Sequence, residues 1–146
     1  EMRDYETIQV AMTAAETGHL IFSTLHTIGS ANTIDRIIDV FPPSQQRQIA
    51  VQLSMVLPAA VSQQLVTTVN GTMIPAFELM TVTPAIRNMI RDNKIPQIEG
   101  IVYSSSNPDM FSMDTSLARL YSNGIISRDT ALSYATNPDM LGKKLR

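Results

Sequence analysis

The sequence predicts an α/β chain, in which a mostly parallel sheet with flanking helices and a β-hairpin precedes a small C-terminal helical bundle. Three observations predict this fold class. A short, β-rich apolar run at His19–Leu25 follows a segment of helical periodicity. Asn70-Gly71, the strongest short hairpin signal, separates two strand-like runs. From Pro84 onward the pattern is helical and is divided by glycines and by Asn137-Pro138.

The N-terminal segments match the second half of a βαβ unit. Asp4 suits the N-cap of a helix whose apolar positions follow the helical period, at Ile8, Ala11, Met12 and Ala15. We expect Gly18 to end this helix, because glycine readily adopts the left-handed conformation. Residues 19–25 are mostly apolar on both faces, as in a buried strand of a parallel sheet. The first strand of the unit would then end just before Glu1.

Two further helices and a hairpin are expected in the middle of the chain. The first helix carries an apolar stripe of Ile34, Ile37, Ile38 and Phe41 and ends at Pro42-Pro43. Ser44 suits the N-cap of the second, whose inward positions are Ile49, Leu53, Val56 and Leu57. Pro58 would break or kink that helix before it continues toward Leu65. The hairpin strands would be Val66–Val69 and Thr72–Val82.

The C-terminal residues are expected to form short helices rather than a linker. Pro84 suits the first turn of a helix at Ala85–Arg91. The later helices are predicted at Pro96–Tyr103, Asp114–Asn123, Ser127–Ala135 and Pro138–Leu145. The chain therefore divides into an α/β part at 1–83 and a helical part at 84–146.

Composition excludes several classes of protein. Apolar residues make up 44% of the 146 residues and charged residues 16%, so the chain can build a core and is not of the disordered type. A net charge of −2 argues against broad nucleic-acid or anionic-membrane binding. The chain has no cysteine, which excludes disulfides and cysteine-based zinc sites. No apolar run approaches the roughly 18 residues of a membrane span, so a cytosolic protein is expected.

Glu1 and His26 are expected to meet at one edge of the sheet. Ligands of open α/β sheets bind outside the carboxyl ends of the strands, where both residues would lie. His19 comes seven residues before His26, roughly 23 Å away at about 3.3 Å per residue. The two histidines therefore cannot serve the same phosphate in one subunit, so His19 is structural or acts at a subunit boundary. The plainer interpretation is that each histidine only ends a strand as a satisfied polar residue.

The sequence A-I-R-N-M-I-R at residues 85–91 divides its side chains between two helix faces. Ile86, Met89 and Ile90 share one face, which should be buried. Arg87 and Arg91 share another, and like charges at this spacing favour a partner carboxylate. An ordinary solvated amphipathic helix explains the same pattern.

The chain contains no phosphate-binding loop of the form G-x-x-x-x-G-K-[ST]. Its lysines are Lys94, Lys143 and Lys144. Gly142-Lys143 is followed by Lys144 rather than by serine or threonine, and no glycine lies five residues before Gly142.

Four stretches of the chain together match one known family. Glu1-Met2-Arg3-Asp4 with Glu6-Thr7-Ile8 is similar to the Walker B region G-E-M-R-D-x-E-T-I, and residues 13–27 are similar to a "His box". Residues 35–42 and the A-I-R-N-M-I-R stretch are similar to sequences of one branch. The chain thus resembles the type IV pilus retraction ATPases of the secretion ATPase superfamily. The assembly ATPases usually carry a cysteine-rich zinc motif, so the absence of cysteine also favours the retraction branch.

This resemblance implies part of a RecA-like motor domain from a cytoplasmic homo-hexameric ring, peripheral to the inner face of the membrane. The ring would bind ATP and Mg²⁺ and drive pilus disassembly and twitching motility together with the inner-membrane machinery at the pilus base. By this resemblance, Glu1 positions Mg²⁺ through water and His26 senses the γ-phosphate. The residues implied to belong to the nucleotide site or to couple it to neighbouring subunits are Arg3, Asp4, His19 and Thr27. Those implied to serve retraction rather than hydrolysis are Ala85, Ile86, Arg87, Asn88, Met89, Ile90 and Arg91.

The chain also departs from the family pattern. The Walker A loop, the Asp box and the N-terminal PAS-like domain are not in this sequence, so we expect an incomplete piece that is inactive alone. Pro58-Ala59-Ala60 stands where relatives often carry an arginine-containing stretch, and Phe111 replaces a usual polar residue. The alternative is an interaction module, which would mediate ring assembly or pilus-base contacts without catalysis.

Overall fold

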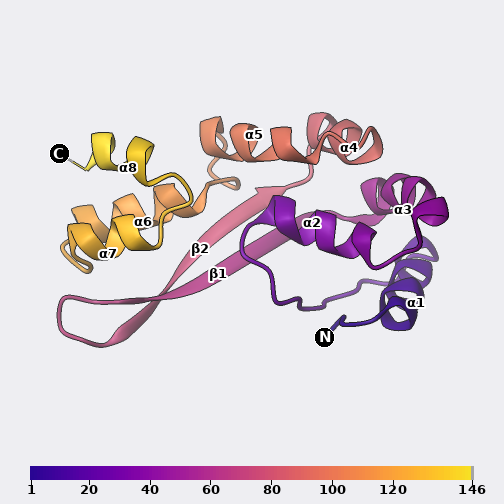
Figure 1. Cartoon of the computed structure of the whole chain (residues 1–146), viewed down its shortest axis with the longest axis horizontal. Helices are drawn as coiled ribbons and strands as arrows, with labels where there is room; N and C mark the ends of the chain where they lie inside the picture. The colour runs from indigo at the N-terminus through magenta and orange to yellow at the C-terminus, as the bar shows by residue number, and fades with distance from the viewer. Residues whose placement is uncertain (146) are drawn as a thin grey trace.

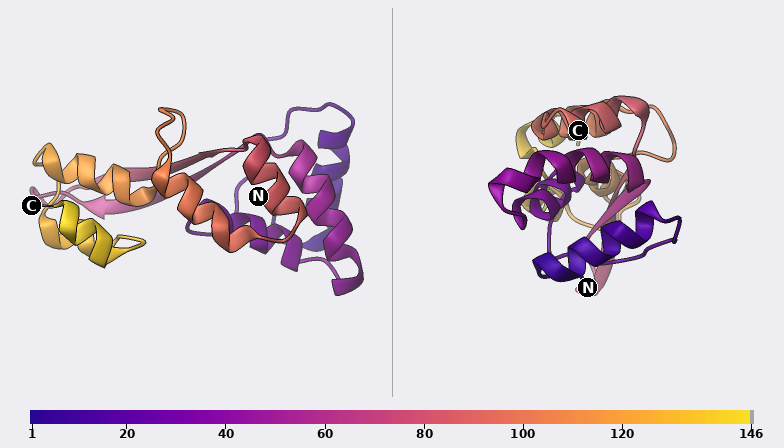
Figure 2. Two further views of the ribbon diagram at one scale, coloured as in Figure 1. Left: turned by 90° about the horizontal axis from the view of Figure 1, so that it is seen from above. Right: turned by 90° about the vertical axis from the view of Figure 1, so that its right-hand side faces the viewer.

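A computed structural model describes residues 1–145, in which a long β-hairpin runs through the molecule with helices near both of its ends (Figure 1). The helices before the hairpin are α1 (Tyr5–Glu16), α2 (Ser30–Asp39) and α3 (Pro43–Val56). Those after it are α4 (Pro84–Arg91), η1 (Ile95–Gln97), α5 (Ile98–Ser104), α6 (Met113–Ser122), α7 (Arg128–Ser133) and α8 (Pro138–Lys144). Two further views show that the molecule is elongated along the hairpin (Figure 2).

The sheet of the described residues consists of two antiparallel strands, β1 (Ala59–Thr67) and β2 (Met73–Thr81). Thr67 pairs with Met73 next to the turn, and Ala59 pairs with Thr81 at the other end. Gly71 in the turn has a φ of 80°, a conformation that glycine adopts without steric cost. The hairpin predicted from Asn70-Gly71 is therefore confirmed, whereas a mostly parallel sheet is not observed in residues 1–145.

Two predicted elements differ from the structure. The helix that ends at Val56 does not continue past Pro58; residues 59–67, with Leu65, form β1 instead. Proline removes a backbone donor and clashes with the preceding helical turn, so a break here is more favourable than a kink. Residues 19–25 are not a buried strand, because no neighbouring strand of residues 1–145 pairs with them; Leu20 is 78% exposed and Phe22 87%.

The other helices follow the predicted periodicity. Gly18 has a φ of 92° just after α1, in agreement with its expected role as a stop signal. The predicted stripe of α2 is buried, as are Ile49 and Leu53 on the inward face of α3, whereas Val56 and Leu57 are partly exposed. The third helix begins at Pro43 rather than after a Ser44 cap. The five predicted C-terminal helices are present, with the 96–103 segment split into η1 and α5.

The buried side chains form two clusters on the hairpin. The larger cluster joins α1–α5 to the end of β2 near Met80 and Val82. The smaller one joins α6–α8 to Val66 and Ala76 near the turn. Both parts of the chain therefore pack on the same two strands. The division at residues 83 and 84 stays a prediction.

The connection between α5 and α6 is attached to β2. Phe111 exchanges two backbone hydrogen bonds of 2.9 Å with Leu79, on the side of β2 that faces away from β1. Ser116 Oγ accepts from the backbone N–H of Phe77 at 3.2 Å, and Thr81 Oγ1 donates to the carbonyl of Asp109 at 2.6 Å. Within residues 1–145, no helix is long and apolar enough to cross a membrane.

Candidate functional site

Glu1 and His26 lie against each other at the N-terminal edge of the molecule. The backbone N–H of Met2 donates to the carbonyl of Thr24 at 3.0 Å, which aligns the first residues with the end of the 19–25 segment. His26 Nε2 is then 2.5 Å from Glu1 Oε1. The His26 side chain is 79% exposed and that of Glu1 31%, so the pair is open to a ligand from solvent.

Arg3 holds the Glu1 carboxyl group in its ionised form. The guanidinium of Arg3 donates from Nε to Glu1 Oε1. This hydrogen bond lowers the pKa of Glu1, and His26 lowers it further by a smaller amount. The same contact raises the pKa of Arg3. A carboxylate with a lowered pKa is a weak base, which suits it to orient water or a metal-bound water rather than to abstract a proton unaided.

Asp4 caps α1. Its carboxylate accepts from the backbone N–H of Thr7 at 2.8 Å and from the Thr7 hydroxyl at 3.2 Å. The backbone hydrogen bond from Thr7 lowers the pKa of Asp4. The structure therefore gives Asp4 a structural contact that fixes the start of the helix directly after the Glu1–Arg3 segment.

Within the described residues, no hydrogen bond or ion pair joins His19 or Thr27 to Glu1 or to each other. His19 Nδ1 lies 3.1 Å from Thr17 Oγ1 and 3.2 Å from the carbonyl of Ala14, at the C-terminal end of α1. Thr27 Oγ1 lies 2.8 Å from Thr33 Oγ1 of α2. The two histidines thus contact different groups at the two ends of the 19–25 segment.

The helix α4 has the predicted two-faced arrangement. Ile86 and Ile90 are fully buried and Met89 packs against the same cluster. Arg87, Asn88 and Arg91 are exposed. Arg91 donates to Asn88 Oδ1 at 2.9 Å and lies 3.5 Å from the carboxylate of Asp92, which is an exposed pair of little energetic weight.

Glu78 and Asp114 are buried carboxylates that none of the sequence motifs includes. Glu78 of β2 is 9% exposed, and Asp114 of α6 is 2% exposed. Asp114 accepts from the backbone N–H groups of Thr136 at 2.7 Å and Asn137 at 3.0 Å. The signal for Glu78 was its place between Ala76 and Met80 on the inward face of a strand, where an acidic residue is unusual.

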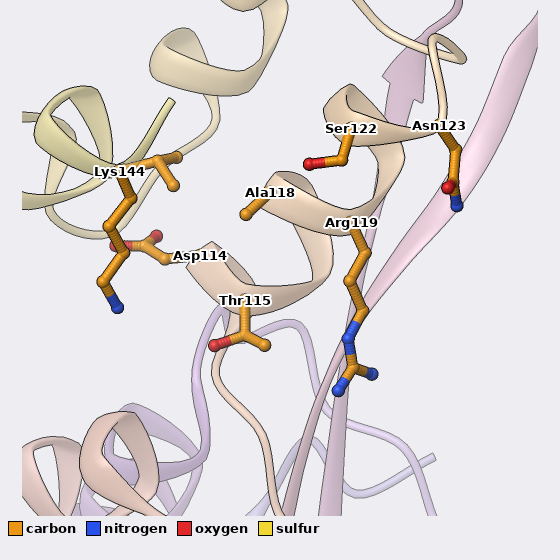
Figure 3. A pocket seen from close by; sticks show the side chains of 8 residues that line it. Asp114, Thr115, Ala118, Arg119, Ser122, Asn123 and Lys144 are labelled. Atoms are coloured by element: carbon orange, nitrogen blue, oxygen red, sulfur yellow. The ribbon is translucent and has the colours of Figure 1, made fainter. Parts of the chain in front are cut away.

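Neither described cavity is lined by Glu1 or His26. One of about 360 Å³ is formed by α6 and α8, and Figure 3 shows Thr115, Ala118 and Ser122 along α6 with Arg119 and Lys144 on either side. Arg119 lies over the ring of Phe111 and Lys144 over that of Tyr103. Both cations are thus engaged with aromatic rings beside this cavity.

No cluster of three or more metal-ligating side chains occurs in the part of the chain that the structure describes. A single carboxylate at the open edge still fits Mg²⁺, because this ion usually keeps several waters and is bound through one or two carboxylates together with substrate phosphates. Glu1 is the carboxylate available at the open edge.

Comparison with known proteins identifies the family. The family model described as "Type II/IV secretion system protein" matches residues 1–77, more than half of the chain. The chain belongs to this family. Among curated members, it is 44% identical over 139 residues to the "Type IV pilus retractation ATPase PilT" of Pseudomonas aeruginosa, covering 95% of this chain and 40% of that protein. It is 44% identical over 142 residues to the "Twitching motility protein" of Neisseria gonorrhoeae, covering 97% and 38%.

A solved member of the family has the same fold over this region. The crystal structure of the pilus retraction motor PilT with bound ADP matches 98% of this chain and 40% of its own, with a TM-score of 0.87 and 40% identity. The ATPase DotB of Legionella pneumophila matches 90% of the chain with a TM-score of 0.76 and 25% identity. The predicted resemblance to pilus retraction ATPases and the predicted partial motor domain are confirmed. The chain spans about two fifths of the length of these relatives.

Proposed function

We propose that this chain supplies one side of an ATP site in a pilus retraction motor. The contact of Glu1 with His26 carries the proposal, because it brings together an ionised carboxylate and an imidazole at an open edge. The similarity to an ATPase named for pilus retraction and to a motor solved with ADP supports the choice of nucleotide. The whole motor would be a hexameric, cytoplasmic ring at the base of the pilus.

Each residue at this edge has a proposed role. Glu1 would hold Mg²⁺ through water and orients a water molecule near the terminal phosphate, and Arg3 keeps its carboxyl group ionised. His26 contacts the terminal phosphate and is held by Glu1 until nucleotide enters. His19 and Thr27, which contact α1 and α2, transmit the state of this edge to those helices or to a neighbouring subunit. When bound, Mg²⁺ would neutralise charge on the phosphates.

Hydrolysis also requires a grip on the phosphates that these residues do not provide. A backbone nest, a lysine and a helix N-terminus give most of the affinity for phosphate in such sites. The loop G-x-x-x-x-G-K-[ST] does not occur in the 146 residues. We therefore expect the chain by itself to show no ATP hydrolysis above that of its Glu1→Gln variant.

The catalytic role of Glu1 is testable in a full-length ATPase that contains these residues. Glu1→Gln removes the negative charge but keeps the shape, so we expect kcat to fall about 100-fold or more while the affinity for ATP is retained. Steady-state phosphate release and equilibrium nucleotide binding measure the two effects. The matched control is Glu99→Gln in α5, an exposed carboxylate outside the segment that resembles Walker B. Unchanged kcat in Glu1→Gln would contradict the proposal.

The exposed face of α4 favours a second function for this part of the chain, namely contact with another component of the motor. Arg87, Asn88 and Arg91 lie outside, while Ile86 and Ile90 fix the helix from inside. We expect Arg87→Ala combined with Arg91→Ala to abolish twitching motility while ATP hydrolysis stays within about twofold. Motility assays and phosphate release on the same variant separate the two activities. A parallel loss of hydrolysis would place this face in the catalytic machinery instead.

A further inference from the structure

Glu78 is a buried carboxylate in the middle of the hairpin. It lies on the inward face of β2 and is 9% exposed. Its cross-strand partner is Ser62 of β1, which is also buried. An ionisable group in such a place is expensive unless hydrogen bonds compensate for the lost water. The groups that donate hydrogen bonds to Glu78 therefore indicate its role in the structure.

The two oxygens of Glu78 bind two different helices. Oε1 accepts from both the backbone N–H and the hydroxyl of Ser30, each at 2.8 Å. Oε2 accepts from the backbone N–H of Met113 at 3.4 Å. Ser30 is the first residue of α2 and Met113 is the first residue of α6. A negative charge at a helix N-terminus is favourable, and this carboxylate serves two such ends at once.

The loop between His26 and α2 rests on this same cross-strand pair. The backbone N–H of Gly29 donates to Ser62 Oγ at 2.9 Å, directly beside the contact of Ser30 with Glu78. Ser30 follows His26 by four residues in the chain. The backbone amides of Gly29 and Ser30 therefore attach the loop that carries the His26 imidazole to the hairpin.

On the other side, the connection continues into the C-terminal helices. Met113 is followed by Asp114, whose carboxylate binds the backbone of Thr136 and Asn137 just before α8. A cavity of about 510 Å³ lies beside Glu78 and Asp114, between the loop at Ile28–Gly29 and the segment 133–137. The hydrogen bonds of Glu78 and Asp114 thus connect the two sides of this cavity, which side chains do not fill.

We infer that Glu78 is a positioning residue that fixes the His26 loop to the C-terminal helices. Through it, a displacement of α6 moves the loop, and a displacement of the loop moves α6. The consequence for ATP hydrolysis rests on the function proposed above, whereas the link between α2 and α6 does not. A glutamine at this position has one accepting oxygen in place of two, so it can keep only one of the two helix contacts.

Amide hydrogen exchange of the 146-residue chain tests the link directly. The N–H groups of Ser30 and Met113 belong to the first turns of their helices and have no intrahelical acceptor, so their protection depends on Glu78. We expect Glu78→Gln to raise the exchange rate of one of them at least tenfold. Glu99→Gln, an exposed carboxylate that lines the same cavity, is the control and should change neither rate. Two unchanged amides in Glu78→Gln would overturn the inference.

A second variant tests the coupling even if Glu78→Gln does not fold. Ser30→Ala removes one hydrogen bond to Oε1 but leaves the carboxylate and both amides in place. If the carboxylate transmits the change, exchange at Met113 should rise about fivefold, the equivalent of one net hydrogen bond. An unchanged Met113 amide in Ser30→Ala would show that the two helices are not coupled through Glu78.

The catalytic consequence is measured in a full-length ATPase that contains this chain. Ser30→Ala should lower kcat while the KM for ATP stays constant, because it displaces His26 from the terminal phosphate and leaves untouched the loop that supplies most of the affinity for phosphate in such sites. Glu99→Gln should leave both parameters unchanged. A kcat that does not change, or a KM that rises as kcat falls, overturns the positioning role. If the unmodified protein hydrolyses no ATP, the proposed function fails, while the exchange measurements still decide whether the link exists.

Discussion

At the scale of single residues, Asp35 combines a partly buried position with a nearby like charge. Burial raises the pKa of Asp35, and Asp39 one helical turn away raises it further. A carboxyl group whose pKa is higher in the folded state binds its proton more tightly there. Its contribution to stability is therefore present below its unfolded pKa and is lost as the pH rises through the folded value.

We expect Asp35→Asn to stabilise the chain at neutral pH. The variant removes a like-charge pair on α2, so the free energy of unfolding should rise by about 0.3 kcal/mol at pH 7. The gain should vanish near about pH 3, where the carboxyl group is protonated in both states. Denaturant unfolding at the two pH values measures this. Asp39→Asn serves as the comparison and should give a smaller gain, because burial of Asp35 remains.

Single residues also mark the limit of what the sequence could predict about the site. Glu1 and His26 were paired from the rule that carboxyl ends of strands meet at one edge, and the structure places them in contact. Glu78 could not be selected from the sequence, because a charged residue in a strand is expected to face solvent until the register of the two strands is known. That register depends on where β1 begins, and a helix continuing past Pro58 was expected in its place.

At the scale of elements, local signals predicted the structure well where a single residue fixes the backbone. Gly18 and Gly71 both have positive φ at the predicted stop and turn. Periodicity found the helices because their buried faces have the 3.6-residue repeat. The 19–25 segment has strong β propensity, but propensity alone does not supply the hydrogen-bonding neighbour that a strand requires.

Two glycine substitutions should have opposite effects on stability. Gly71→Ala places a side chain at a φ of 80°, so it should lower the free energy of unfolding by about 1–2 kcal/mol, even though no atom lies within 4 Å of the added carbon. Gly100→Ala lies inside α5, also with free space, and should gain about 0.5–1 kcal/mol from helix propensity. Thermal unfolding of both variants measures the contrast, and equal signs would contradict it.

At the scale of the whole molecule, the hairpin is the common support of two clusters. The change from a mixed to a helical pattern divides the sequence according to the order of its elements. Packing follows the register of β1 and β2 instead, since Ala76 and Val66 belong to the cluster of α6–α8 and Met80 to that of α1–α5. Contacts between residues far apart in the chain carry no local pattern, so this arrangement could not be predicted from periodicity.

The bridge between Leu79 and Phe111 makes the two edges of the sheet unequal. On β2, the backbone at Leu79 is already paired on its outer side, and Ser116 occupies the N–H of Phe77. An incoming strand from another chain would therefore find the middle of this edge blocked. Aggregation by strand addition should then use the edge of β1, and because each chain offers one such edge it should stop at a pair of chains.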